Sequence, residues 1–356
     1  MKRKSLPALL AVFAISGGML GASAFAVPHI SASTQKMQQK LPPSNSASDI
    51  VPILYVKDKA PVSTVEEYLK QAMTAEEMEQ IYKYMDSSKR ESAEGTRKMS
   101  VQEEKRLKEL KQQYIYDGLR PENKLPLKAG EARFYLDLNK DILVFPKQSL
   151  SNEELLQYID WTARVNFALA QRIERPQPDQ KDISKQEAID KALKSIASLF
   201  DFDASKLEVS AAYNKFGPGQ KGMWLVHFQP YKVEALRANG KDYMMYDVFI
   251  DSLSGAVIDT TIFNSAYKRT PITPELYRSI KRDSSWVEIA QSIVTDKAGE
   301  KREIEKITYL QKAIYDKLGV VAIKVALKDG SSYTAELRYP DQSLRCLVYE
   351  PAKSST

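Results

Sequence analysis

The chain has 356 residues, of which 43% are hydrophobic, and it carries 52 Lys and Arg against 46 Asp and Glu. This length and apolar content suffice for two or three packed domains. Residues 1–26 hold three basic residues and no acid, so beyond them 49 basic residues face 46 acidic ones, a net charge of +3. A charge so near balance excludes basicity as an argument for nucleic-acid binding, and we expect no nucleic-acid partner.

Residues 1–26 have the three parts of a secretory signal peptide. Residues 2–4 are basic, Leu9–Ile15 form an apolar centre, and Ala24-Phe25-Ala26 places small residues where a signal peptidase reads. We therefore predict cleavage near Ala26. The alternative is an uncleaved anchor over residues 6–26, which is long enough to span ~30 Å of hydrocarbon. We expect membrane association only in that case.

The rest of the chain is predicted to lie outside the cytoplasm, in the cell envelope or the extracellular medium. There is no cysteine near Ala26, which argues against a lipid-anchored form. The single cysteine, Cys346, cannot form an internal disulfide, and an exported protein without disulfides is typical of Gram-positive bacteria. Cys346 lies in an apolar strand-like run, so we predict a buried, inert thiol.

Residues 27–60 are rich in Ser, Gln and Pro without periodicity, which predicts a flexible linker. Residues 61–178 predict a helical region with one β-hairpin. Helices are expected to begin at the capping patterns Ser63–Glu66, Thr74–Glu77 and Ser151–Glu154, and another to run from Ser100 to Tyr116. In that last helix, Lys105 and Arg106 stand among Glu103, Glu104 and Glu109, which indicates a solvated face.

The hairpin is predicted from Arg133–Leu138 and Ile142–Phe145, which flank the turn residues Asn139-Lys140-Asp141. Asp137, Asn139 and Asp141 imitate the start of a calcium-binding loop. Ile142 stands where that loop needs glycine and Gln148 where it needs glutamate, so we expect no calcium.

Residues 179–270 predict one α+β unit. Ser184–Glu187 form a capping box that opens a helix, and apolar residues then alternate over 207–211, 224–228 and 246–250. Ser254-Gly255 predicts a turn into a last strand. One helix over an antiparallel meander follows from this pattern.

Within it, residues 182–262 resemble the PepSY domain of exported bacterial proteins and of thermolysin-type metallopeptidase propeptides. The matching motifs are Ile183-Ser184-x-x-Glu187-Ala188, Trp224-Leu225-Val226-x-Phe228 and Tyr246–Asp251 followed by Ser254-Gly255-x-Val257. The segment Tyr231–Lys241 is an insert relative to a compact hairpin. The resemblance implies a role in restraining or chaperoning an exported peptidase. From the residues alone, Trp224 and Phe228 are expected in the core, and Asp251 and Gly255 in a tight turn.

Residues 271–356 are predicted to form a second α+β unit, in which 284–350 repeat the plan of a helix followed by a meander. Residues 303–318 fit helical spacing, but a strand there would complete the repeat. The fold class is therefore α+β, with a helical N-terminal region followed by two helix-on-antiparallel-meander units.

Enzyme classes find little support in the sequence. The two histidines, His29 and His227, are too few for a His-Glu-x-x-His zinc site, and a Ser-His-Asp site would rest on His227 alone. Strand alternation puts His227 opposite Val226 and Phe228, so we expect it to be exposed or at a rim. Ser33-Thr34-Gln35-Lys36 matches the Ser-x-x-Lys pattern by chance. We assign no catalytic residue, metal ligand or cofactor, and no particular binding residue.

Three hypotheses remain open. The first is a non-enzymatic binding or regulatory protein of the cell envelope, whose partner is an exported peptidase or another envelope protein and whose strand edges could bind peptide. The second is a carboxylate-based hydrolase of wall polymer or peptide, which needs two acids in one cleft. The third is a structural envelope or spore-associated protein that assembles through residues 61–118.

Overall fold

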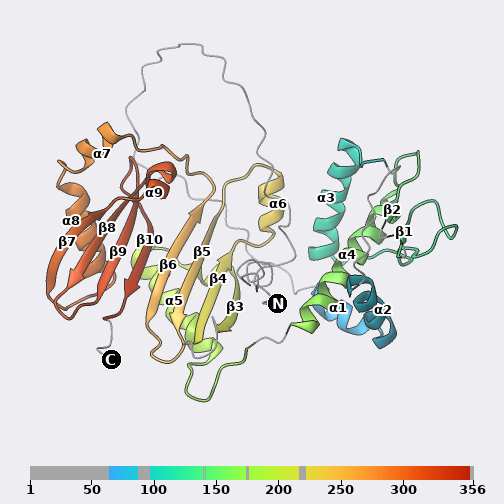
Figure 1. The fold of residues 1–356 in the computed structure, drawn as a ribbon, viewed down its shortest axis with the longest axis horizontal. Helices are drawn as coiled ribbons and strands as arrows, with labels where there is room; N and C mark the ends of the chain where they lie inside the picture. Colours follow the sequence, from blue (N-terminus) through green and yellow to red (C-terminus); the bar gives the residue numbers. More distant parts are fainter. Residues whose placement is uncertain are drawn as a thin grey trace, which may run out of the picture. The chain divides into compact units, whose positions relative to one another are not determined.

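The computed structural model describes residues 64–86, 97–138, 140, 142–173, 176–215 and 222–352. The predicted signal peptide and linker lie outside the described residues, as do Ser33–Lys36, Asn139 and Asp141. The described residues fall into two compact units, the helical unit within 57–174 and 234–240 and the sheet unit within 175–233 and 241–356 (Figure 1).

The helical unit is built around its longest helix. Its elements are α1 (Val65–Ala72), α2 (Ala75–Asp86), α3 (Val101–Tyr116), β1 (Tyr135–Asp137), β2 (Ile142–Val144) and α4 (Asn152–Arg172). The first three helices pack on α4 and bury Leu69, Ile81 and Leu110 with it. The predicted hairpin is confirmed as the antiparallel pair β1–β2.

Helix starts in this unit follow the predicted capping patterns closely. Capping boxes join Ser100 to Glu103 and Ser151 to Glu154 through both reciprocal hydrogen bonds. The prediction for α1 is wrong by one residue, because its box joins Thr64 to Glu67 and not Ser63 to Glu66. Two capping residues stand side by side there, and the sequence pattern does not decide between them.

The sheet unit contains two meanders, each preceded by a helix. The first has α5 (Lys185–Phe200), β3 (Glu208–Lys215), β4 (Gly222–Gln229), β5 (Met244–Asp251) and β6 (Val257–Asn264). The second has α7 (Pro274–Ile280), α8 (Ser285–Ser292), β7 (Ile304–Leu310), α9 (Ala313–Leu318), β8 (Val320–Leu327), β9 (Ser332–Arg338) and β10 (Leu344–Glu350). The insert between β4 and β5 forms the short helix α6 (Val233–Ala238), which from Glu234 on belongs to the helical unit.

The two meanders form one antiparallel sheet of eight strands, in the order β3-β4-β5-β6-β10-β9-β8-β7. They join where β6 pairs with β10, with Thr260 opposite Leu347 and Thr261 opposite Cys346. We call this junction the seam. The mixed helix and antiparallel sheet predicted from the sequence is confirmed, whereas the assignment of the meanders to the PepSY type stays a prediction.

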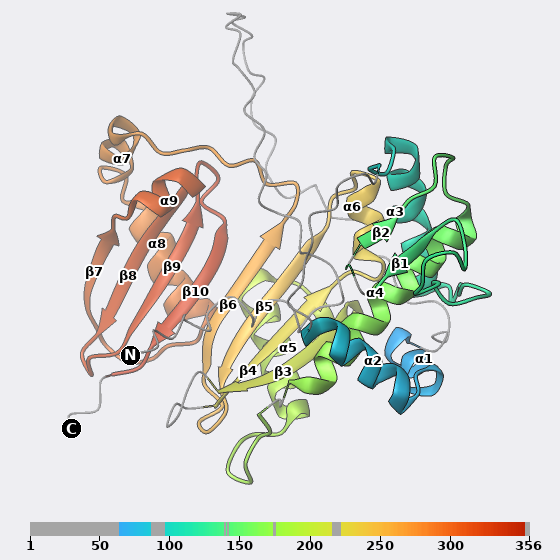
Figure 2. The ribbon, with the colours of Figure 1, turned by 45° about the vertical axis from the view of Figure 1, so that its right-hand side comes forward.

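Helices α5 and α8 of the sheet unit lie behind the strands in Figure 2. Period-two alternation places Trp224, Val226 and Phe228 of β4 under α5, where they are buried as predicted. In the second meander, Trp286 and Ala290 of α8 pack into the corresponding core. A π-helical turn, Ile293–Lys297, extends α8 towards the end of α5.

Residues 303–318, for which the sequence left helix and strand open, contain a strand followed by a helix. Strand β7 completes the second meander, and α9 follows it. Gly319 ends α9 with φ +65°, and a Cβ there would meet the carbonyl oxygen of Thr270 at 2.5 Å. Glycine is required at this position for both reasons.

Candidate functional site: a cleft over the seam

A cleft of about 460 Å³ lies on the helix-covered face of the sheet, over the seam. Residues of α5, the β5–β6 turn, the π-helical turn, β9 and β10 line it, so both meanders contribute to its walls. Its charged lining residues are Lys191, Lys194, Lys297 and Arg302, and the lining includes no Asp or Glu.

One face of α5 supplies a wall of the cleft. Lys191, Lys194, Ser195 and Ser198 recur at helical spacing and line it. On the neighbouring face, Ala188, Ala192, Ile196 and Leu199 are buried in the core. The amphipathic pattern that docks α5 on the sheet thus also turns its lysines towards the seam.

The cations of the lining differ in their partners. Lys297 Nζ lies 2.7 Å from Asp201 and donates to the Leu199 carbonyl oxygen at 3.2 Å, which caps the end of α5. Arg302 pairs with Glu300 and with Asp329. Among the described residues no carboxylate is in ion-pair contact with Lys191 or Lys194. The positive charge available to a ligand therefore sits on these two lysines.

The β5–β6 turn shapes the rim next to Lys191. Asp251 accepts a hydrogen bond from the Ser254 N–H at 2.7 Å, and Gly255 has φ +68°, as expected for a tight turn. A Cβ at Gly255 would lie 2.7 Å from Lys191 Cε. The bare glycine lets the aliphatic stem of Lys191 pass over the turn.

Two tyrosines form an aromatic wall of the cleft. The rings of Tyr333 and Tyr349 lie with centroids 4.9 Å apart, and the Arg302 guanidinium lies 5.6 Å from the Tyr349 centroid. The Tyr333 hydroxyl donates to Glu300 at 3.0 Å. Burial, together with the Glu300 carboxylate, raises the pKa of Tyr333 to about 12, so the phenol stays protonated.

His227 lies on the opposite face of the sheet from the cleft, as its alternation with Val226 and Phe228 predicted. It is not exposed, because only 19% of its side chain is accessible, so it is partly buried. Its Nδ1 is 2.6 Å from Asp247 Oδ1. Burial opposes its protonation, but the hydrogen bond and charge of Asp247 outweigh burial and raise its pKa.

The register brings Ser210, His227 and Asp247 into one row across β3, β4 and β5. These are the residue types of a serine hydrolase, yet His227 Nε2 faces the Gln229 amide oxygen at 3.3 Å. In a catalytic triad that nitrogen faces the nucleophile. The row is better explained as cross-strand polar pairing on a sheet face.

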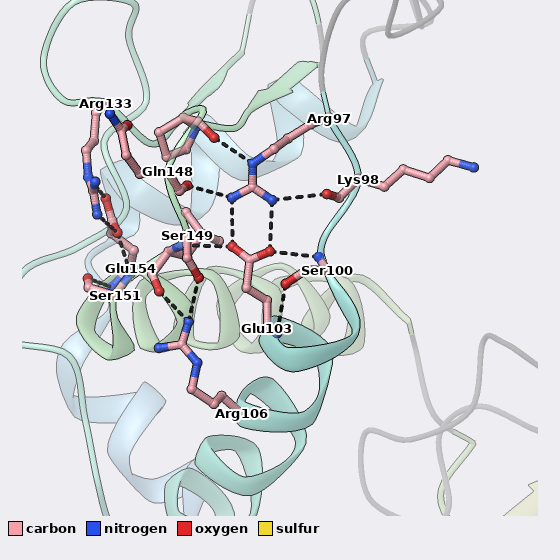
Figure 3. Close-up of polar contacts among 12 residues, drawn as sticks. Arg97, Lys98, Ser100, Glu103, Arg106, Arg133, Gln148, Ser149, Ser151 and Glu154 are labelled. Atoms are coloured by element: carbon pink, nitrogen blue, oxygen red, sulfur yellow. Dashed lines mark hydrogen bonds and ion pairs between the residues drawn. The ribbon is translucent and has the colours of Figure 1, made fainter.

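The prediction of a solvated face on α3 is wrong for Glu103. Only 1% of its surface is accessible, and its carboxylate accepts hydrogen bonds from Arg97, the Ser100 N–H and the Leu150 N–H (Figure 3). Arg106 of the same helix donates to the Leu150 carbonyl oxygen. The cluster ties the segment before α4 to the N-terminus of α3, so we assign it a structural role.

A second buried cluster of the helical unit was not predicted at all. Asp160 and Arg164, one turn apart on α4, pair at 2.6 Å and are 1% and 3% exposed. Tyr114 donates to Asp160 at 2.8 Å, and Glu77 pairs with Arg164 at 3.1 Å. The signal in the sequence was an i, i+4 acid–base pair on the apolar side of a helix.

Cys346 is buried, as predicted, and burial raises the pKa of its thiol. Over the described part of the chain, no group of three His, Cys, Asp or Glu side chains is arranged to hold a metal ion. The described helices also include none that is long and apolar enough to cross a membrane.

Comparison of the chain with family models, curated proteins and solved structures gave no match. The PepSY resemblance therefore rests on the residues that suggested it, and the cleft is argued from its own geometry.

Proposed function

We propose that this chain is an exported, non-enzymatic binding or regulatory protein of the cell envelope, and that the cleft over the seam is its binding site. The observation that carries the proposal is the preformed cleft itself. Its volume of about 460 Å³ is in the usual range for ligand sites, and it combines an aromatic wall with Lys191 and Lys194, which form no ion pair with a carboxylate of the described residues. Export is proposed from residues 1–26, and a peptidase partner from the PepSY resemblance.

The hydrolase alternative has weaker support. The seam cleft and a second cavity of about 270 Å³ in the helical unit, beside Tyr84 and Trp161, have no carboxylate in their linings. On the face of the sheet away from α5, burial raises the pKa of Asp259, but the nearby Glu336 is already paired with Arg345. Neither Asp259 nor Glu336 lines either of the two cavities, whereas hydrolysis by carboxylates needs two acids in one cleft.

The assembly alternative makes a different prediction. If residues 61–118 drove assembly, the purified protein would self-associate as its concentration rises. Sedimentation that stays monomeric from micromolar to millimolar concentration would remove this alternative and leave the binding proposal untouched.

Partner capture tests the proposal directly. The tagged protein is exposed to the extracellular fraction of the producing cells, retained proteins are identified, and peptidase activity is assayed with and without it. Ser198→Trp fills the cleft from an exposed position on α5, and Ala197→Trp adds the same bulk at an exposed residue outside the lining. We expect capture and lowered peptidase activity with the wild type and A197W, and loss of both with S198W. Equal capture by S198W would refute the cleft as the site.

A further inference from the structure

We infer that the cleft binds a small organic anion, whose carboxylate or phosphate lies at Lys191 and Lys194 and whose apolar or aromatic body rests on Tyr333 and Tyr349. This rests on the proposed function only in taking the cleft as a binding site, and it adds the chemical class of the ligand. The two anion types share the chemistry that the lysines recognise, and the experiment below separates them.

The charge of the lining favours an anion. Lys191 and Lys194 are three residues apart on one helix face, where two like charges destabilise the helix. Glu187, one turn before Lys191, lowers this cost slightly, but it is exposed and engaged in the capping box with Ser184. A bound anion would relieve the repulsion between the two ammonium groups.

The hydroxyl groups of the lining already have partners. Ser195 and Thr260 share a hydrogen bond at 2.8 Å, Ser198 donates to the Lys297 carbonyl oxygen, and Tyr333 donates to Glu300. A ligand that depends on many directional hydrogen bonds would have to break these contacts. A ligand that is recognised by its charge at the lysines and by its shape at the tyrosines leaves these hydrogen bonds intact.

The remaining surface suits an apolar body. Val257, Leu347 and the two tyrosine rings line the cleft over the seam. The two rings are tilted against each other by 40°, and an aromatic ring offers a face on which a planar group can stack. The size of the cleft fits one such group with its anion.

Calorimetric titration of the purified protein tests the inference with four probes. Phenyl phosphate and benzoate carry an anion on a ring, inorganic phosphate is the anion alone, and benzyl alcohol is a neutral ring. We expect phenyl phosphate, benzoate or both to bind, inorganic phosphate to bind more weakly, and benzyl alcohol to bind least. The relative affinity of the first two tells phosphate from carboxylate. Binding should weaken as salt rises from about 50 to about 500 mM.

Variants locate the site. The double variant K191A/K194A should lose about tenfold in affinity for the ring-bearing anions, whereas K185A, on an exposed lysine of α5 outside the lining, should bind like the wild type. Tyr349→Leu should reduce phenyl phosphate affinity towards that of inorganic phosphate. Circular dichroism confirms that each variant is folded.

The inference is overturned if no anion binds, if benzyl alcohol binds as tightly as benzoate, or if K191A/K194A matches K185A. In each case the proposed function stands as long as S198W still abolishes partner capture. If S198W and A197W captured the partner equally, the proposed function itself would be refuted.

Discussion

At the scale of single residues, Glu103 shows how much a buried carboxylate contributes to stability when both of its oxygens accept hydrogen bonds. Each oxygen accepts from Arg97 and from one backbone N–H. In Glu103→Gln an NH₂ group would face two of these donors, and we expect a loss of about 2–3 kcal/mol in the free energy of unfolding. Urea denaturation measures it, with Glu104→Gln, on an exposed neighbour, as the near-neutral control.

Glu103 also makes the stability of the folded protein depend on pH in the acid range. The hydrogen bonds from Arg97 hold the pKa of Glu103 well below its usual range in the folded protein. A depressed folded pKa contributes stability above the unfolded value, near about 4.3, and that contribution is lost as pH falls through the folded value. The cost of E103Q should therefore shrink as pH falls below about 4. A cost equally large at pH 2 and pH 7 would contradict this.

The stability contribution of His227 depends on pH in the opposite direction. Asp247 raises its pKa, so the pair contributes stability below the unfolded value of about 6.5 and loses it as pH rises through the folded pKa. The difference in unfolding free energy between the wild type and His227→Gln should be largest at pH 5 to 6 and decline towards pH 8 to 9. A difference that does not vary over that interval would show that the imidazolium–Asp247 contact contributes nothing.

At the scale of elements, Arg338 of β9 stabilises the seam through hydrogen bonds to β6 and β10. It is 6% exposed and donates to the carbonyl oxygens of Ile262 and Leu344 at 3.1 Å each, and it lies 4.9 Å from the Tyr267 ring centroid. Arg338→Ala removes both of these buried hydrogen bonds, and we expect a loss of about 2–3 kcal/mol in the free energy of unfolding. Hydrogen exchange should speed up most in β6 and β10. Arg278→Ala, in an exposed ion pair, is the control and should change little.

The elements themselves were largely predictable, because their signals are local. Capping boxes at Ser100, Ser151 and Ser184 and the alternation along β4 fix helix starts and strand faces within a few residues. The seam was not predictable, because nothing in the sequence of β6 or of β10 indicates that these two strands pair with each other. Glu103 was misjudged for the same reason: its burial depends on Arg97 and on the backbone at Leu150, which lies 47 residues away.

At the scale of the whole molecule, the candidate site is a product of the topology. The lysines of α5 and the tyrosines of β9 and β10 come together because the second meander returns to place β10 against β6. From the sequence, the segment that holds the lysines predicts a helix and the segments that hold the tyrosines belong to a predicted meander, with no sign that they meet. The seam joins the two meanders into one sheet and forms the cleft above it, which is why the site could not be assigned from the sequence.

The central claim is that the protein binds through this cleft and not through the free edges of the sheet at β3 and β7. Hydrogen exchange of the protein, alone and with its captured partner, tests it most directly. We predict new protection in 191–199, 255–260 and 297–302, with the edge strands unchanged. Protection concentrated in β3 or β7 would contradict the cleft and show that the partner binds by strand addition.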